Sequence, residues 1–242
     1  MSERYIDNIF FDIIDYINRD KEIPYHIVGK VYESCSSYDG YAIGGLFNYI
    51  LKDPNANKIL NVFDNLKILD IFLPEIGILK NVPQNKSRSD NVFIHTLNVL
   101  KEVPYDDIVL RWAALLHDIG KYDTYMLYKN FLQHSQFSYI KSNRILDRFN
   151  IQNAEEISII IKFHMLPLDY QRQPNWKDEA IISFINKCHP NYVMKIIDFA
   201  YYDKRSENGY EEYLKPIEEL RKKVIYFLND TSYFRNTKKD DL

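Results

Sequence analysis

The sequence predicts an all-α protein, and two observations support that prediction. Only seven glycines occur in 242 residues, and no Asn-Gly or Asp-Gly pair lies between alternating strand patterns, so tight β-hairpins are not expected. Near the N-terminus, apolar residues recur in steps of three and four, which is typical of one face of a helix. These residues are Ile6, Ile9, Phe10, Ile13, Ile14 and Ile17.

Helical periodicity and loop-forming residues divide the chain into a series of expected helices. In the first third, helices are expected over 5–17, 40–52 and 55–72. The segment 74–88 contains two prolines and few periodic residues, so it is expected to be a connection. Beyond a boundary near residue 85, the expected helices cover 90–103, 106–119, 134–149, 154–166, 177–187, 190–206 and 209–229.

We expect these segments to form a helical bundle with an extension and a tail. Residues 1–85 are the expected N-terminal helical extension, and residues 86–232 are the expected main domain. Residues 233–242 are expected to be disordered, because the stretch from Asn236 onward offers nothing apolar to bury before Leu242.

The composition is that of a packed globular protein. Hydrophobic residues make up 46% and charged residues 27%, which excludes a disordered or low-complexity chain. A net charge of −3 argues against a broadly basic nucleic-acid-binding surface but leaves a local basic groove possible. The two cysteines cannot build a disulfide framework, and no targeting segment or membrane span is evident, so we expect a cytoplasmic protein.

From residue 95 onward, histidines and aspartates follow one another at about one position per expected helix. Facing helices of a bundle can each contribute one inward side chain to a metal site. Imidazoles and carboxylates without thiolates suit Mn²⁺, Fe, Co²⁺, Ni²⁺ or Zn²⁺ better than Ca²⁺. A single histidine is more often an ordinary packed side chain, so the argument depends on the whole series. Its members are His95, His117, Asp118, His134, His164, Asp198 and Asp203.

The adjacent pair His117-Asp118 is the most informative part of the series. It follows a strongly apolar segment that begins at Arg111, and Gly120 comes directly after it as an expected helix end. Burying an unpaired carboxylate costs several kcal/mol, so a cationic group should compensate Asp118.

Several stretches together resemble the HD-domain metal-dependent phosphohydrolases, a family named after its adjacent His-Asp pair. More narrowly, about residues 60–210 are similar to the HD domain of bacterial tRNA nucleotidyltransferases, the CCA-adding enzymes. The resemblance depends on the order and spacing of several motifs. These are Leu73-Pro74-Glu75, Val82-Pro83-Gln84-Asn85, the segment from Val92 through His95 to Leu97, the segment Arg111–Lys121, His134, Phe163-His164 and Asp203-Lys204-Arg205.

The resemblance implies a site for one or two divalent transition-metal ions, with Mg²⁺ as a further possibility. By this resemblance, His95, His117, Asp118 and Asp203 hold the first ion. His134 and His164 hold a second ion, bridged by Asp118.

The last ligand is open between two aspartates. Asp198 and Asp203 are separated by about 140° around a helix, so both cannot point at one metal. The sequence Asp203-Lys204-Arg205 favours Asp203, because it resembles the family's aspartate followed closely by arginine.

The resemblance also implies phosphohydrolase chemistry, with Asp118 and Lys121 as catalytic residues. Lys121, Arg88 and Lys86 are candidate contacts to a phosphate, although Lys121 also suits an ordinary helix end and the other two a solvated loop. The expected substrate is a nucleotide or an RNA terminus, cleaved by phosphatase or 2′,3′-cyclic phosphodiesterase activity.

Two alternatives stay open at this point. One is a nucleotidase or nucleoside triphosphatase that acts on free mononucleotides, and the other is a non-catalytic RNA- or protein-binding module. Nucleotidyl transfer is not expected: Gly44-Gly45 resembles part of the required head, but the segment 53–57 lacks its D-x-D metal motif. The oligomeric state is not predicted.

Overall fold

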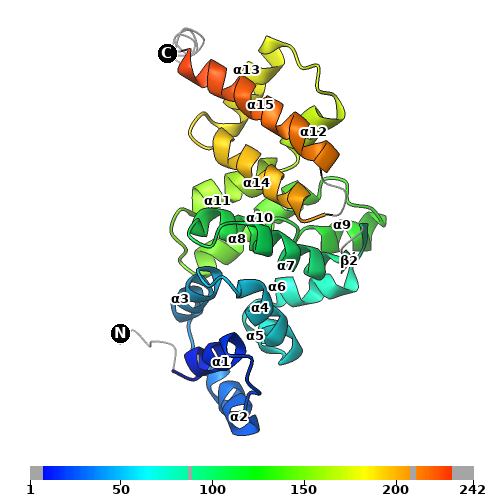
Figure 1. The fold of residues 1–242 in the computed structure, drawn as a ribbon. Coiled ribbons are helices and arrows are strands. Elements are labelled where there is room, and N and C mark those ends of the chain that lie inside the picture. The colour runs from blue at the N-terminus through cyan, green and yellow to red at the C-terminus, as the bar shows by residue number, and fades with distance from the viewer. Residues whose placement is uncertain (1–7, 87–88, 208–210, 231–242) are drawn as a thin grey trace.

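The computed structural model describes residues 8–86, 89–207 and 211–230. Within these ranges it confirms the all-α fold, with one short hairpin as its sheet. The elements form an elongated stack, with α1 (Asn8–Asn18) and α2 (Tyr25–Ser34) at one end and α13 (Asp178–Cys188) and α15 (Glu211–Asn229) at the other (Figure 1). The expected tail over 233–242 lies outside the described residues.

The N-terminal helices follow the apolar stripe of the sequence with two differences. α1 buries Phe10, Ile13, Ile14 and Ile17, as the periodicity predicts. The helix expected over 55–72 is broken, because Lys67 adopts a left-handed conformation with φ of 59°. α2 was not predicted, and it buries only two of its ten residues, which leaves little periodic signal. The remaining elements here are η1 (Cys35–Ser37), α3 (Gly40–Leu51), α4 (Ala56–Asn65), α5 (Ile68–Phe72), α6 (Pro74–Gly77) and η2 (Ile78–Asn81).

A hairpin replaces part of the connection expected over 74–88. Its strands β1 (Pro83–Lys86) and β2 (Ser89–Asn91) pair antiparallel, with Pro83 opposite Asn91 and Lys86 opposite Ser89. The Val92 amide also donates to the Val82 carbonyl at 2.9 Å, so the hairpin is fixed to the start of the next helix.

Helix α8 (Ile108–Leu116) lies at the centre, and its residues from Val109 to Leu116 are all buried. It packs against α7 (Val92–Glu102) and α11 (Ala154–Phe163), while α10 (His134–Arg148) packs on α11 and α9 (Lys121–Tyr128) packs on α10. Asn91 caps α7 by accepting from the Ile94 amide at 3.0 Å, and Asp107 caps α8 through the Leu110 amide at 3.0 Å. The sequence did not predict α9, where the buried residues are polar.

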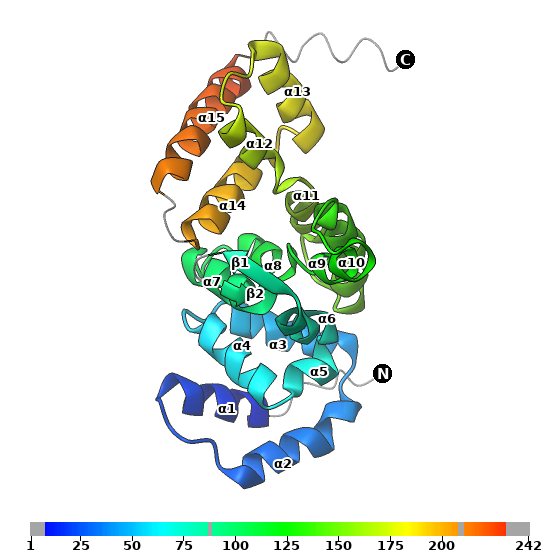
Figure 2. The same cartoon turned by 90° about the vertical axis from the view of Figure 1, so that its right-hand side faces the viewer.

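The C-terminal helices form the last layer (Figure 2). They are α12 (Leu166–Arg172), α13, α14 (Val193–Arg205) and α15. α14 packs on α7 and α8, and α15 in turn covers α14 and α12. The helix expected over 154–166 ends at Phe163, and α12 begins three residues later. Among the described residues, no helix is long and apolar enough to cross a membrane.

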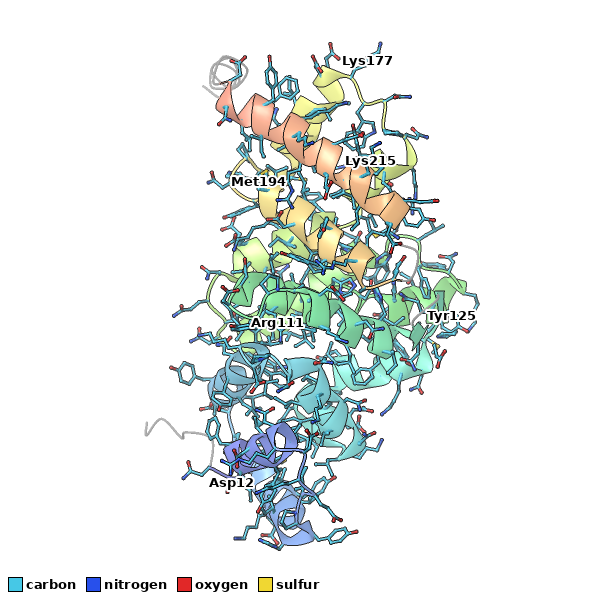
Figure 3. The ribbon with its side chains drawn as sticks, in the orientation of Figure 1. Asp12, Arg111, Tyr125, Lys177, Met194 and Lys215 are labelled. Atoms are coloured by element: carbon cyan, nitrogen blue, oxygen red, sulfur yellow. The ribbon has the colours of Figure 1, made fainter. Side chains whose placement is uncertain are left out.

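Arg111 connects the N-terminal helices to the central ones. Its buried guanidinium donates to the carbonyls of Leu51 at 2.8 Å, Asp53 at 3.0 Å and Val103 at 3.1 Å, and also to that of Leu100. Burial lowers the pKa of Arg111 to about 10, so it remains charged at neutral pH. Figure 3 labels this residue where the central and N-terminal helices meet.

Candidate metal centre

The turn after α8 presents His117 and Asp118 to the interior. The His117 amide still bonds to the Ala113 carbonyl at 2.8 Å, so its ring projects from the last turn of the buried helix. Gly120 follows, and a Cβ built there would lie only 2.4 Å from the His134 carbonyl oxygen and 2.5 Å from the Ser138 amide nitrogen. The glycine therefore lets the start of α10 approach the turn closely, and this approach places His134 beside Asp118.

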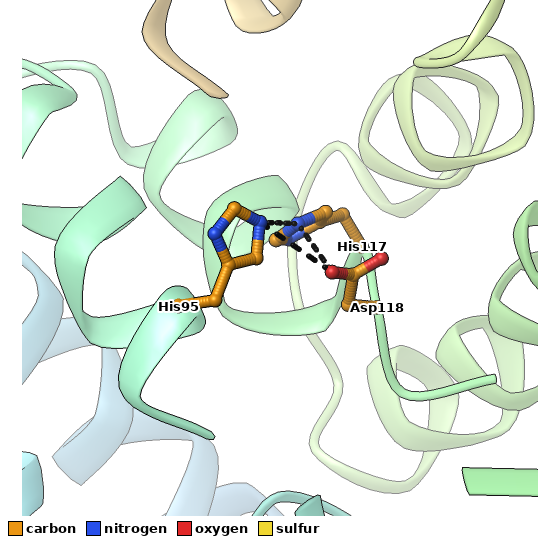
Figure 4. Close-up of side chains that lie close together, drawn as sticks. All are labelled: His95, His117 and Asp118. Atoms are coloured by element: carbon orange, nitrogen blue, oxygen red, sulfur yellow. Dashed lines mark hydrogen bonds and ion pairs between the residues drawn. The ribbon is translucent and has the colours of Figure 1, made fainter. Parts of the chain in front are cut away.

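Six predicted side chains meet at this turn. His95 comes from α7, His134 begins α10, His164 follows α11 and Asp203 lies on α14. All six are buried, with exposed fractions between 1% and 6%. Two groups have ligand atoms within 4.8 Å of one another: His95 with His117 and Asp118, and Asp118 with His134 and His164. Figure 4 shows the first group.

Backbone carbonyls fix the orientation of three imidazoles. The Nδ1 atoms of His117, His134 and His164 lie 2.9, 2.7 and 2.7 Å from the carbonyl oxygens three residues earlier. A carbonyl oxygen can only accept, so each Nδ1 carries the proton and donates it. In the neutral rings the Nε2 atoms are therefore unprotonated, as a metal ligand requires.

These Nε2 atoms point at one another and at carboxylates. The distances are 3.4 Å between Nε2 of His117 and His95, and 3.2 Å between Nε2 of His134 and His164. Asp118 Oδ2 lies 3.1 Å from His117 Nε2, and Asp118 Oδ1 lies 3.3 Å from His134 Nε2. Asp203 Oδ1 lies 3.0 Å from His95 Nε2. Converging lone pairs repel one another unless a cation lies between them.

The buried carboxylates are only partly satisfied. Asp118 Oδ2 forms an ion pair with Lys121, whereas no hydrogen bond of good geometry reaches Asp118 Oδ1 or Asp203 Oδ1 among the described residues. Such orphaned acceptors are rare in proteins, and together with the imidazoles they form the nitrogen and oxygen donor set of a divalent transition metal. The residues present therefore fit the predicted metal.

The pKa directions agree with a site built for positive charge. Burial alone would raise the pKa of Asp118, but the charges of His117 and Lys121 hold it well below its usual value. For Asp203, the contact with His95 similarly outweighs burial and lowers the pKa. Burial lowers the pKa of His164 to about 3, so its ring stays neutral and able to bind metal at neutral pH.

His117 and His95 shift in opposite directions. Burial opposes charge on His117, but neighbouring Asp118 more than compensates, so its pKa is raised. The pKa of His95 is lowered, because burial outweighs the contact with Asp203.

Lys121 lies at the edge of this cluster, as the sequence predicts. Its buried ammonium is 2.6 Å from Asp118 Oδ2 and donates to Gln84 Oε1 at 2.9 Å. Gln84 was not predicted as a site residue, although it belongs to one of the resembling motifs. Its isolated position in a connection gave no signal that a hairpin would bring it here.

The remaining predicted residues lie elsewhere or outside the described part. Asp198 Oδ1 pairs with Arg221, so Asp203 is the aspartate that joins the cluster. Lys86 belongs to β1, but the structure does not describe its side chain, and Arg88 lies outside the described residues. Their predicted contacts to phosphate stay predictions.

A cavity of about 750 Å³ opens onto the cluster. The segment between α9 and α10 supplies Phe131 and Leu132 to its wall, and the start of α12 supplies Met165 and Leu168. Lys121 and Asp118 lie at its base with four of the other five predicted ligands. A space of this size accommodates a small-molecule ligand of nucleotide dimensions.

Residues 89–219, more than half of the sequence, match the family model described as "HD domain". The chain belongs to the HD domain family. The match includes all six clustered side chains, and the cluster itself contains the adjacent His-Asp pair.

Several curated relatives match part of this chain. An A-adding tRNA nucleotidyltransferase of Deinococcus radiodurans is 28% identical over 130 residues, which are 49% of this chain and 30% of that protein. A multifunctional CCA protein of Ectopseudomonas mendocina is 33% identical over 75 residues, which are 29% of this chain and 18% of that protein. A Neisseria meningitidis protein of the same name is 36% identical over 78 residues, 31% of this chain and 19% of its own. The match thus spans less than a third of each relative.

Proposed function

We propose that this protein is a divalent-metal-dependent phosphohydrolase that cleaves a phosphoester of a nucleotide or an RNA terminus. The observation that carries the proposal is the convergence of four imidazole Nε2 atoms and two carboxylates in one buried cluster. We assign His95, His117, Asp118 and Asp203 to one ion and His134, His164 and the shared Asp118 to a second.

The charged residues that line the cavity support the proposal that substrate binding requires metal. Among the described lining residues, the cationic side chains Lys121, Arg172 and Lys204 are matched by three aspartates. Arg172 and Lys204 are also paired with Asp169 and Glu207. An anionic phosphoester therefore requires further positive charge. Bound divalent ions supply that charge and activate water for attack at neutral pH.

The protein's own groups position the reacting phosphate. Two of the three Lys121 N–H donors face Asp118 and Gln84, which leaves one for a phosphoryl oxygen. Donors fixed in a buried site stabilise developing charge without reorganising. The oxygen of a water molecule then bonds to phosphorus, and the phosphorus–oxygen ester bond breaks. The departing oxygen takes up the proton that the water loses and leaves as a hydroxyl group.

The relatives favour an RNA terminus as substrate. One of them is named a tRNA nucleotidyltransferase and the others are named CCA proteins. We extend only this substrate class to the present chain. A phosphatase or a 2′,3′-cyclic phosphodiesterase acting on an RNA end is the specific activity proposed.

A turnover screen tests the proposal, with inorganic phosphate measured for the monoesters and triphosphates and the ring-opened monophosphate measured by chromatography for the cyclic nucleotides. Metal-stripped protein is supplied with Mn²⁺, Ni²⁺, Co²⁺ or Mg²⁺ and tested on 3′-phosphorylated RNA, 2′,3′-cyclic nucleotides, and nucleoside mono- and triphosphates, with Asp118→Asn as the inactive control. Metal-dependent turnover of RNA ends or cyclic nucleotides is expected. Turnover of mononucleotides alone, with little salt dependence, would instead identify a nucleotidase. Tight metal binding without turnover of any substrate would indicate a binding module.

A further inference from the structure

The hairpin carries a buried amide to the wall of the metal-centre cavity. Gln84 lies on β1, its exposed fraction is 2%, and it lines the same cavity as Asp118 and Lys121. A buried glutamine side chain has donors and acceptors to satisfy, so its partners show what its surroundings provide.

The contact with Lys121 determines which way the amide faces. Lys121 Nζ can only donate, and it lies 2.9 Å from Gln84, so the amide oxygen Oε1 must face it. The other end of the amide, Nε2, then carries two N–H donors. Nε2 is buried and has no hydrogen-bond partner among the described residues.

No described residue supplies an acceptor for Nε2, and Gln84 lines the cavity, so we consider an acceptor bound in the cavity. Nε2 belongs to a residue that also holds Lys121, and Lys121 is in turn paired with Asp118 of the proposed metal centre. A group that accepts from an ammonium and a neighbouring neutral amide beside a metal site needs several exposed oxygen atoms. A phosphoryl group meets this requirement with its non-bridging oxygens.

We propose that Gln84 is a substrate-binding residue whose Nε2 donates to a non-bridging phosphoryl oxygen while its Oε1 holds Lys121 toward the same phosphate. This proposal rests on the phosphohydrolase function proposed above. It adds a neutral donor to the site, which binds phosphate without competing with the metal ligands for the ions.

Binding of inorganic phosphate to the Mn²⁺-loaded protein, measured by calorimetry, tests the proposal independently of turnover. Gln84→Leu removes both functions of the amide and is expected to weaken phosphate binding about 10- to 100-fold. Gln84→Glu is nearly isosteric, keeps an acceptor for Lys121 and replaces the N–H donors with an anionic oxygen, so it is expected to weaken binding at least as much. Gln136→Leu, at an exposed position on α10, is the matched control and should leave binding unchanged.

The outcomes separate this proposal from the proposed function. All variants should bind Mn²⁺ with the stoichiometry of the wild type, because Gln84 is not a ligand. Wild-type phosphate affinity in Gln84→Leu overturns the role of Gln84, and wild-type affinity in Gln84→Glu overturns the N–H contact, leaving Gln84 as a positioning residue for Lys121. Wild-type protein that binds Mn²⁺ but not phosphate overturns this proposal and the phosphohydrolase function together.

Discussion

The two ends of α8 carry buried polar groups with opposite environments. At the first end, Arg111 donates to four backbone carbonyls, so its donors are matched by acceptors. At the other end, Asp118 Oδ2 and the Nε2 atoms of His117 and His95 converge within 3.5 Å, and Lys121 is the one described cation that pairs with this carboxylate. Burial alone does not distinguish them, because both are almost fully enclosed. Matched partners indicate a structural role, whereas unmatched partners indicate a place for a ligand.

Asp118→Asn should produce the largest functional effect, because Asp118 is shared by both proposed ions. Turnover is expected to fall at least ~1,000-fold, since removing a group central to the reaction commonly costs this much. Metal-dependent thermal stabilisation should also disappear, because only a bound ion stabilises the folded state by mass action. Calorimetric titration with Mn²⁺ and melting curves with and without chelator measure both effects.

The metal-free protein provides the control for Asp118→Asn. Without metal, its free energy of unfolding should fall by about 1–3 kcal/mol, because neutral Asn loses the charge interaction with Lys121 that holds the Asp118 pKa low. A metal-dependent shift in melting temperature equal to that of the wild type would contradict the assignment of Asp118.

Arg111→Met should show the opposite behaviour. The change leaves four buried carbonyls without their donor, and a loss of about 3–5 kcal/mol in the free energy of unfolding is expected. Urea denaturation measures this loss. The folded fraction should still bind Mn²⁺ and gain stability from it, so a variant of normal stability would remove the contrast between the two ends of α8.

Gly120→Ala tests whether close backbone approach builds the metal centre. Its Cβ would meet the backbone of α10 at 2.4 Å, so α10 must move. We expect a loss of about 2–4 kcal/mol in stability together with weaker metal binding, because overpacking forces backbone shifts and His134 moves with the helix. Urea denaturation and Mn²⁺ titration measure the two effects.

Gly45→Ala is the matched control for that change. Gly45 lies in α3, and a Cβ there meets nothing within 4 Å. Alanine should therefore stabilise the helix by up to about 1 kcal/mol and leave metal binding unaltered. Equal effects at the two glycines would show that the approach of α10 does not limit the site.

The smallest expected effect is the difference in Mn²⁺ affinity between Asp203→Asn and Asp198→Asn. Asp203 contacts His95, whereas Asp198 pairs with Arg221. Loss of one carboxylate ligand is expected to weaken Mn²⁺ binding about 10- to 100-fold in Asp203→Asn, a range seen even for removal of groups that support ligands. Asp198→Asn should bind Mn²⁺ as the wild type does, and weakened binding there would reopen the choice between the two aspartates.

The sequence alone determined the all-α class and most helix positions, and it identified the His and Asp side chains that meet in the buried cluster. Apolar periodicity depends on local spacing, so the stripe of α1 was readable without any tertiary information. The order and spacing of the His and Asp residues similarly allowed the HD resemblance to be recognised, and the family match confirms that resemblance.

Tertiary structure decided what depends on contacts between distant segments. Helices α2 and α9 bury too few apolar residues to leave a periodic signal. The left-handed conformation of Lys67, the hairpin at 83–91 and the separate helix α12 were not predicted either. The sequence favoured Asp203 over Asp198 by resemblance, and the packing of α14 on α7 brings Asp203 to His95. Gln84 contacts Lys121, which is 37 residues away, and Arg111 contacts Leu51, which is 60 residues away, and no local pattern in the sequence records such separations.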